Sequence, residues 1–422
     1  MRPVVQRLSG SLLVRNVGFE GIGLLVNMVA VTASFVLIAR ALGPDHYGLV
    51  AGSVALTTIV GPFSSGGANH LLVKRRAQTD ESLSVIIRPL LGMVLTGGAG
   101  AMLVVLAVRP FVLEVIPGEV LALICVSELV LGRSLVLLQQ VGQALERLEI
   151  SSFIRSQWSV ARLTGALIYL LVVPRATPAG WALALLCINA AGVTLAWLTV
   201  RRMTSTTVTV SLPGLGDVGE GLAFSMNASS EFIKKDIDKT LLISIKGEGV
   251  AGLYTAAYRV LEIAMAPIIA LANSTSSRFF RQGATSVDQT RILARRLTSI
   301  LAVYGMTCMV ALWLGAPLLS WILGDQYDEA VSVLRWIVAI PLLVGMQVFA
   351  AALLTGIGRQ HERLLYSAIG TVTNVVLNLA LIPTWSWRGA VVATYIAELV
   401  SLAGLWSAYF RLADKGTVEE QA

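Results

Sequence analysis

The chain has 422 residues, of which 55% are hydrophobic and only 14% are charged, and its mean hydropathy is +0.76. Soluble domains carry about 25% charged residues, so this composition excludes an ordinary soluble protein and predicts an integral membrane protein. The formal net charge of +7 at pH 7 predicts no nucleic-acid partner, because the basic residues gather in the loops between apolar segments.

Apolar segments of about 20 residues, the length that crosses a bilayer, recur along the whole chain. The first follows an N-terminus without a small-residue cleavage site, and we interpret it as a retained first span. The connections are too short to hold a folded soluble domain. The sequence therefore predicts an all-α polytopic protein with twelve spans, in chain order 17–40, 47–70, 84–108, 118–142, 152–173, 179–200, 218–245, 249–275, 295–318, 330–355, 363–383 and 389–410.

The Lys and Arg residues of the loops predict the orientation of these spans. Twenty of them lie on the side that holds both termini, and five lie on the other side. Basic residues favour the cytoplasmic side, so both termini are expected in the cytoplasm and the spans in the inner (plasma) membrane. If 218–245 did not cross, the basic cluster at 278–296 would face outward. This charge-rich segment is therefore predicted to span the bilayer.

An internal repeat predicts two lobes. VGQALERL at 141–148 matches IGRQHERL at 357–364, and YGLVA at 47–51 resembles AGLYT at 251–255. At one constant offset, Pro174, Gly180 and Trp197 align with Pro383, Gly389 and Trp406. The matches predict six-helix lobes at 1–205 and 206–422, related by a pseudo-two-fold axis along the membrane normal, with a cleft between them.

The seventh span holds six charged side chains within the nine residues EFIKKDIDK at 231–239. A charge at mid-membrane costs roughly 2.5–3.5 kcal/mol on insertion scales, so these residues must face protein or water. On a helix, four of them share one face about 100° wide, and two pairs have the i,i+4 spacing that lets opposite charges neutralise each other. The shared face holds Glu231, Lys234, Lys235 and Asp238.

Two readings of this segment remain open at the sequence level. In the first, its charges and those of span 8 form an ion-pair network that fastens the two spans. In the second, the cationic excess holds an anionic substrate at mid-depth, since the matching face of span 1 in the repeat is apolar. The substrate site would then contain the cations Lys234, Lys235, Lys239 and Arg259, with the acids Glu231, Asp238 and Glu262.

Polar residues on other spans suggest a small cation site. Oxygen ligands suit hard cations, and the candidates for a monovalent ion are Asp236, Asp238, Asn374, Asn378 and Thr394. Hydrogen bonds between helices explain the same residues. For Glu128, Arg133 and Arg162 we expect a packing role. No ATP-binding motif, HExxH or catalytic triad is found, so we expect neither an enzyme nor a cofactor.

Three segments resemble a known family. IARALGPDHYGLVAGSVAL at 38–56, GGANHLLVKRRA at 66–77 and DIDKTLLISIKGEGVAGLYTAAYRVLE at 236–262 resemble the polysaccharide flippases of the multidrug/oligosaccharidyl-lipid/polysaccharide exporter (MOP) superfamily. The resemblance covers nearly the whole chain in span number and loop length. Many relatives have fourteen spans, and the additional C-terminal pair is missing here.

The resemblance implies a V-shaped transporter that alternates between inward-open and outward-open states, with spans 1, 2, 7 and 8 around its cavity. Its substrate would be a polyprenyl-diphosphate-linked saccharide flipped to the outer leaflet for cell-surface polysaccharide synthesis. Lys234, Lys235, Lys239 and Arg259 would then lie near the diphosphate. We expect a monomer that contacts membrane lipid and works beside glycosyltransferases or a polymerase. The alternatives are a drug/cation antiporter of the same superfamily, a membrane polymerase and a lipid scramblase.

Overall fold

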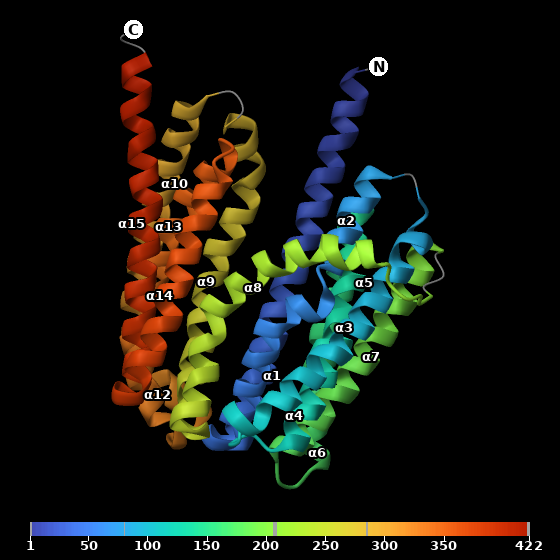
Figure 1. Cartoon of the computed structure of the whole chain (residues 1–422), viewed down its shortest axis with the longest axis vertical. Helices are drawn as coiled ribbons and strands as arrows, with labels where there is room; N and C mark the ends of the chain where they lie inside the picture. The colour runs from blue at the N-terminus through green and yellow to red at the C-terminus, as the bar shows by residue number, and fades with distance from the viewer. Residues whose placement is uncertain (1, 80, 206–208, 284–285, 420–422) are drawn as a thin grey trace. The chain divides into compact units, whose positions relative to one another are not determined.

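The computed structural model describes residues 2–79, 81–205, 209–283 and 286–419 (Figure 1). The described residues form helices, with no strand among them. The chain divides into two compact units, Met1–Asp236 and Ile237–Ala422. This boundary falls inside helix α8, so residues 209–236 belong to unit 1. The predicted lobe boundary at 205/206 stays a prediction.

Unit 1 contains seven α-helices, a π-helix and the first part of α8. They are α1 (Arg2–Ser65), α2 (Ala68–Gln78), α3 (Leu83–Val112), α4 (Gly118–Cys125), the π-helix η1 (Val126–Gly132), α5 (Arg133–Ala144), α6 (Leu148–Val172), α7 (Pro178–Thr204) and α8 (Leu215–Lys246). Its core packs aliphatic side chains of α2, α3, α5, α6 and α7, among them Leu71, Ile87, Leu90, Leu137 and Ile154.

Unit 2 holds the end of α8 and the remaining helices. They are α9 (Glu248–Gly283), α10 (Val287–Gly315), α11 (Pro317–Leu323), the 3-10 helix η2 (Asp325–Tyr327), α12 (Asp328–Ile337), α13 (Ile340–Gly356), α14 (Gln360–Trp385) and α15 (Trp387–Glu419). Figure 1 shows α10, α13, α14 and α15 as neighbouring, nearly parallel rods. The core of unit 2 includes the stacked rings of Phe279 on α9 and Phe349 on α13, with centroids 5.6 Å apart.

The helices confirm a polytopic all-α membrane protein. Among the described residues, eight helices are long and apolar enough to cross a membrane, or nine when the bent pair Asp325–Ile337 and Ile340–Gly356 counts as one span. The first of them, Gly23–Gln78, contains two predicted spans separated by a kink. The 25-residue α6 and the 32-residue α8 are also long enough and carry charges in their interior. This arrangement is consistent with twelve spans.

The tenth predicted span is not one straight helix. The segment 330–355 contains α12 and α13, whose axes differ by 40°. Pro341 lies in the first turn of α13, where its missing N–H and fixed φ favour a new helix start. Arg335, which the sequence places inside a span, therefore lies on a short separate helix.

Two glycines support the predicted repeat near the start of each unit. Gly43 has φ 74° at the kink of α1, and Gly247 has φ 90° between α8 and α9. A positive φ is cheap for glycine and costly for other residues. The two positions differ by the same offset as YGLVA and AGLYT. The same register therefore places a turn before the second span of each half.

The predicted repeat register around VGQALERL is wrong by one helical turn. The turn after α5 has its positive φ at Glu146, and the turn after α13 has it at Gly358. In both turns the next N–H donates to a carbonyl five residues back, from Arg147 to Gly142 and from Arg359 to Leu354, each at 2.8 Å. The sequence had aligned Glu146 with Glu362, which lies in the first turn of α14. The ERL letters occur in both halves at different places relative to the turn. The residue with positive φ is Glu146 in the first half and Gly358 in the second half.

Candidate functional site

Helix α8 carries the charge-rich segment, and its first half packs closely against other helices of unit 1. Ser225 Oγ donates to the carbonyl of Pro62 at 2.8 Å. The rings of His70 and Phe224 stack with centroids 5.5 Å apart. Gly221 approaches the turn at Gly66 so closely that a Cβ would lie 1.8 Å from the Gly66 carbonyl oxygen. This small residue sets how near α8 lies to the turn between α1 and α2.

We expect Gly221→Ala to lower the free energy of unfolding by about 1–3 kcal/mol, because the new methyl group meets backbone that must shift. Thermal unfolding of the purified protein in detergent micelles measures the effect. Gly219→Ala is the matched control, since no atom lies within 4 Å of a Cβ there. Equal unfolding of the two variants would contradict this account of the contact.

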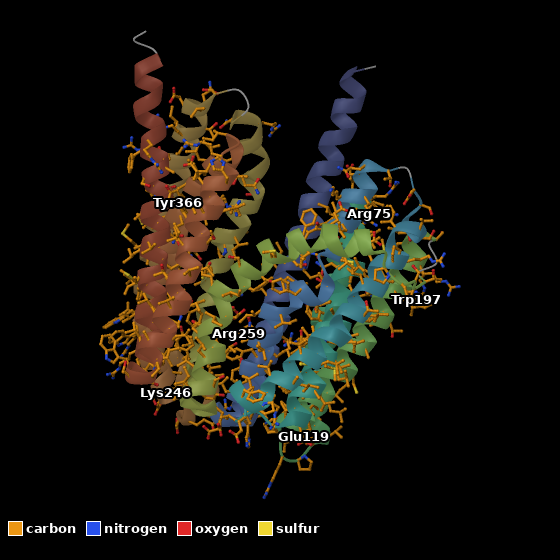
Figure 2. The ribbon with its side chains drawn as sticks, in the orientation of Figure 1. Arg75, Glu119, Trp197, Lys246, Arg259 and Tyr366 are labelled. Carbon is orange, nitrogen blue, oxygen red and sulfur yellow. The ribbon has the colours of Figure 1, made fainter. Side chains whose placement is uncertain are left out.

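Ion pairs join the start of α8 to α2. Lys74 Nζ lies 2.6 Å from Glu220, and Arg75 Nη2 lies 2.6 Å from Asp217 and 3.2 Å from Glu220. Figure 2 shows Arg75 at this place in unit 1. The groups are partly exposed, so each pair contributes modestly to stability. The sequence analysis missed these partners, although the acidic residues at the start of α8 were the signal that could have found them.

The Asp238–Lys239 pair lies at the other end of the charged segment, inside unit 2. Asp238 is only 2% exposed and Lys239 only 4%. The Asp238 carboxylate accepts from the Lys239 backbone N–H at 2.8 Å and from the Tyr254 hydroxyl at 2.6 Å. The Lys239 ammonium lies 4.0 Å from Asp238 and 4.6 Å from the ring centroid of Tyr258.

The contacts around Asp238 and Lys239 stabilise both of these buried charges. The carboxylate has two donors and a neighbouring cation, and the ammonium also lies over an aromatic face, which attracts it electrostatically. These contacts support an ion pair between Asp238 and Lys239, and the predicted role of both residues in substrate binding stays a prediction. The hydroxyl that donates to Asp238 at 2.6 Å belongs to Tyr254 of α9.

Among the predicted site residues of unit 2, Arg259 is a cation that stays partly exposed. Its guanidinium donates to Glu262 at 2.8 Å, and both side chains remain partly exposed (Figure 2). In unit 1, Lys234 is half-buried and Lys235 is exposed. The Glu231 side chain lies outside the described residues. The cations with a reachable head group are thus Lys234, Lys235 and Arg259, and their role in binding stays a prediction.

The predicted cation ligands are all buried. Asn378 Nδ2 donates to the backbone and side-chain oxygens of Asn374 at 2.8 and 3.1 Å. Within the described part of the chain, Asn378 Oδ1 and Thr394 Oγ1 have no hydrogen-bond partner. Asp236 is also buried and belongs to unit 1. The Asn378 oxygen fits a cation ligand, because a cation needs lone pairs that no hydrogen occupies.

A further buried carboxylate was not expected from the sequence. Glu398 on α15 is buried and accepts from Gln347 Nε2 of α13 at 2.5 Å. A lone acid within an apolar run was the available signal. In unit 1, the Asn189 side chain donates to the Ser127 hydroxyl at 2.9 Å and to Glu128 at 3.4 Å, in keeping with a packing role for Glu128.

Comparisons with known proteins agree with the predicted family. The family model described as polysaccharide biosynthesis protein matches residues 37–332. None of the curated proteins matches this sequence.

Solved structures of transporters share the fold. A multidrug resistance MATE family transporter of the MOP superfamily in its inward-facing conformation is 17% identical, with a TM-score of 0.74 over 92% of this chain and 95% of that one. An outward-facing MATE family transporter is 16% identical, with a TM-score of 0.65 over 94% and 96%. A MOP superfamily transporter from Pyrococcus furiosus is 15% identical, with a TM-score of 0.64 over 94% and 95%. At this identity the likeness shows the fold alone.

Proposed function

Because the chain belongs to the polysaccharide biosynthesis protein family and has the fold of MOP superfamily transporters, we propose that it flips polyprenyl-diphosphate-linked saccharides. The substrate moves from the cytoplasmic to the outer leaflet of the inner membrane by alternating access, for cell-surface polysaccharide synthesis. The family match over residues 37–332 is the observation that carries this proposal. It favours a saccharide substrate over the drugs named for the structural neighbours.

The charges of α8 and α9 support an anionic headgroup. A diphosphate and its sugar cannot cross hydrocarbon unaided, and cationic side chains can replace the water that a phosphate loses. The reachable cations Lys234, Lys235 and Arg259 are proposed to contact the diphosphate, with Glu262 2.8 Å from Arg259 to hold the guanidinium in place. Glu231 would limit the net charge of α8. Asp238 and Lys239 fix the end of α8 against α9, so that Lys239 acts on the substrate only at a distance.

The buried oxygens of α14 and α15 support a monovalent cation as the coupling ion. In this proposal Asn378 Oδ1, which has no donor within the described residues, binds the ion together with Asn374, Thr394 and the carboxylate of Asp238. We expect Thr394→Val, which keeps the shape and removes the oxygen, to abolish stimulation of transport by sodium. Thr307→Val, at an exposed hydroxyl of α10, is the control. Unchanged stimulation in Thr394→Val would contradict the ion site.

The proposed orientation in the membrane follows from the distribution of basic residues. Twenty loop Lys and Arg residues on one side against five on the other favour cytoplasmic termini. The transporter is proposed to act as a monomer that receives its substrate from glycosyltransferases and supplies a polymerase of the same pathway.

A transport assay tests the proposal against its nearest rival. The purified protein is reconstituted in vesicles with a fluorescent polyprenyl-diphosphate oligosaccharide, and the fraction exposed on the opposite leaflet is followed over time. We expect translocation that depends on the protein, and no uptake of a cationic dye. The alternative, a drug/cation antiporter, takes support from the multidrug transporters among the structural neighbours. Dye uptake without lipid translocation would establish that alternative and overturn the proposal.

A further inference from the structure

Several tryptophans follow one another along unit 2 near the end that carries Lys246, which Figure 2 labels. Five of the nine tryptophans in the chain lie there: Trp313, Trp321, Trp336, Trp385 and Trp387. Two contacts join the helices at this end of unit 2. The Lys246 ammonium donates to the Pro383 carbonyl at 2.8 Å, and the rings of Trp336 and Trp387 lie 6.0 Å apart. In the repeat register, the matching end of unit 1 holds Trp181, which is buried. A general membrane-interface belt would supply both units alike.

Two of these rings form the walls of a hollow around Arg335. The hollow has a volume of about 350 Å³ and is lined by Trp313, Ser332, Arg335 and Trp336. The Arg335 guanidinium lies 5.2 Å from the centroid of the Trp313 ring, at a distance where the ring attracts the cation. Trp313 is 51% exposed and Trp336 48%. The rings thus hold the guanidinium in place and leave room for a ligand beside it.

The positive charge of Arg335 in the hollow has no acidic ion-pair partner among the described residues. Throughout the described residues, Arg335 forms no salt bridge, and Glu329 of the same helix accepts from the Trp387 indole N–H at 3.0 Å. The Ser332 hydroxyl, one helical turn before Arg335, adds a second donor to the lining. A guanidinium and a hydroxyl side by side present donors and no negative charge, which suits a phosphate group.

The position of Trp313 indicates where such a phosphate would come from. It continues a row of exposed apolar side chains on α10, which contains Ile300, Val303, Met306 and Val310. Such a row on a membrane-spanning helix faces the lipid chains. The hollow therefore opens where the lipid-facing side of unit 2 ends, at the depth at which tryptophans meet lipid headgroups.

We propose that the hollow between Trp313 and Trp336 binds the phosphate headgroup of an anionic phospholipid through Arg335 and Ser332. The lipid tails lie along the apolar row of α10, so one lipid molecule occupies this end of unit 2. The site does not depend on which substrate the protein transports.

Quenching of tryptophan fluorescence by lipids tests this site. The full chain is placed in phosphatidylcholine nanodiscs containing either phosphatidylglycerol or phosphatidylcholine brominated on the acyl chains. We expect brominated phosphatidylglycerol to quench at about fivefold lower concentration, since one cation near the membrane surface contributes about this preference. Arg335→Gln is expected to remove the preference, and Arg335→Lys to keep most of it.

Arg388→Gln is the matched control. Arg388 lies at the same end with its guanidinium 5.4 Å from the Trp387 ring, and it does not line the hollow. Its replacement should leave the preference unchanged. The proposal is overturned if Arg335→Gln keeps the preference, or if Arg388→Gln loses it equally, which would mean a general effect of surface charge. Displacement of the quencher by soluble glycerol phosphate would assign the site to free phosphates rather than lipid.

Discussion

Asp238→Ala is expected to lower the free energy of unfolding by about 3–5 kcal/mol, the usual cost of removing one partner of a buried ion pair. Lys239 is 4% exposed and lies 4.0 Å from the Asp238 carboxylate. The substitution also leaves the buried Tyr254 hydroxyl without the acceptor that it contacts at 2.6 Å. Chemical unfolding of the purified protein in detergent micelles, with and without the substitution, measures the difference.

Removing both charges should cost much less than removing one. The double variant Asp238→Leu/Lys239→Met keeps similar volumes and removes both charges of this pair, so the part of the loss that comes from splitting the ion pair should return. The Tyr254 hydroxyl lacks its Asp238 acceptor in both variants. Glu262→Ala serves as a control at a partly exposed ion pair and should cost at most about 1 kcal/mol. If Asp238→Ala unfolds like the wild type and fails to bind the substrate, the buried pair is part of the substrate site and our structural account of it is wrong.

Substitution of the reachable cations is expected to weaken substrate binding strongly. Arg259→Ala and the double variant Lys234→Ala/Lys235→Ala should each lower the affinity for polyprenyl-diphosphate saccharide by tenfold or more. A hydrogen bond to a charged group contributes about 1.5–3 kcal/mol, which corresponds to roughly 10–150-fold in a dissociation constant. Binding titrations on purified variants measure the change.

The matched control for these variants is Arg388→Gln, a cation exposed at the end of unit 2. It should bind the substrate as the wild type does. Thermal unfolding of Arg259→Ala should change little, because its ion pair with Glu262 is partly exposed. Variants that bind normally and unfold at a lower temperature would show that these cations stabilise the fold and that the substrate site lies elsewhere.

The helical membrane fold was predictable from the sequence because its signals are local. Apolar segments of about 20 residues define spans wherever a bilayer must be crossed. Gly43 and Gly247, with positive φ, were readable as turns from composition alone. The break between α12 and α13 was not predicted, since hydropathy is continuous across it and a proline in the first turn of a helix leaves no gap in the pattern.

The candidate site was only partly predictable, because helical spacing shows which residues share a face and not what another helix presents to them. Helical spacing placed Lys235 and Asp238 on one face of α8, yet Lys235 is exposed and Asp238 is buried. Tyr254 and Tyr258 on α9 contact Asp238 and Lys239. The hollow around Arg335 combines α10 and α12, which are separated along the chain by α11 and the 3-10 helix η2. Pairings of this kind become visible only when the packing of the helices is known.

A binding titration of the wild-type protein tests the central claim most directly. The ligands are a polyprenyl-diphosphate saccharide and the same lipid-linked saccharide without phosphates. The proposed function predicts saturable binding of the first and at least tenfold weaker binding of the second, because the cations Lys234, Lys235 and Arg259 would contact the diphosphate. Equal affinity for both ligands, or binding of neither, would contradict recognition of a diphosphate headgroup.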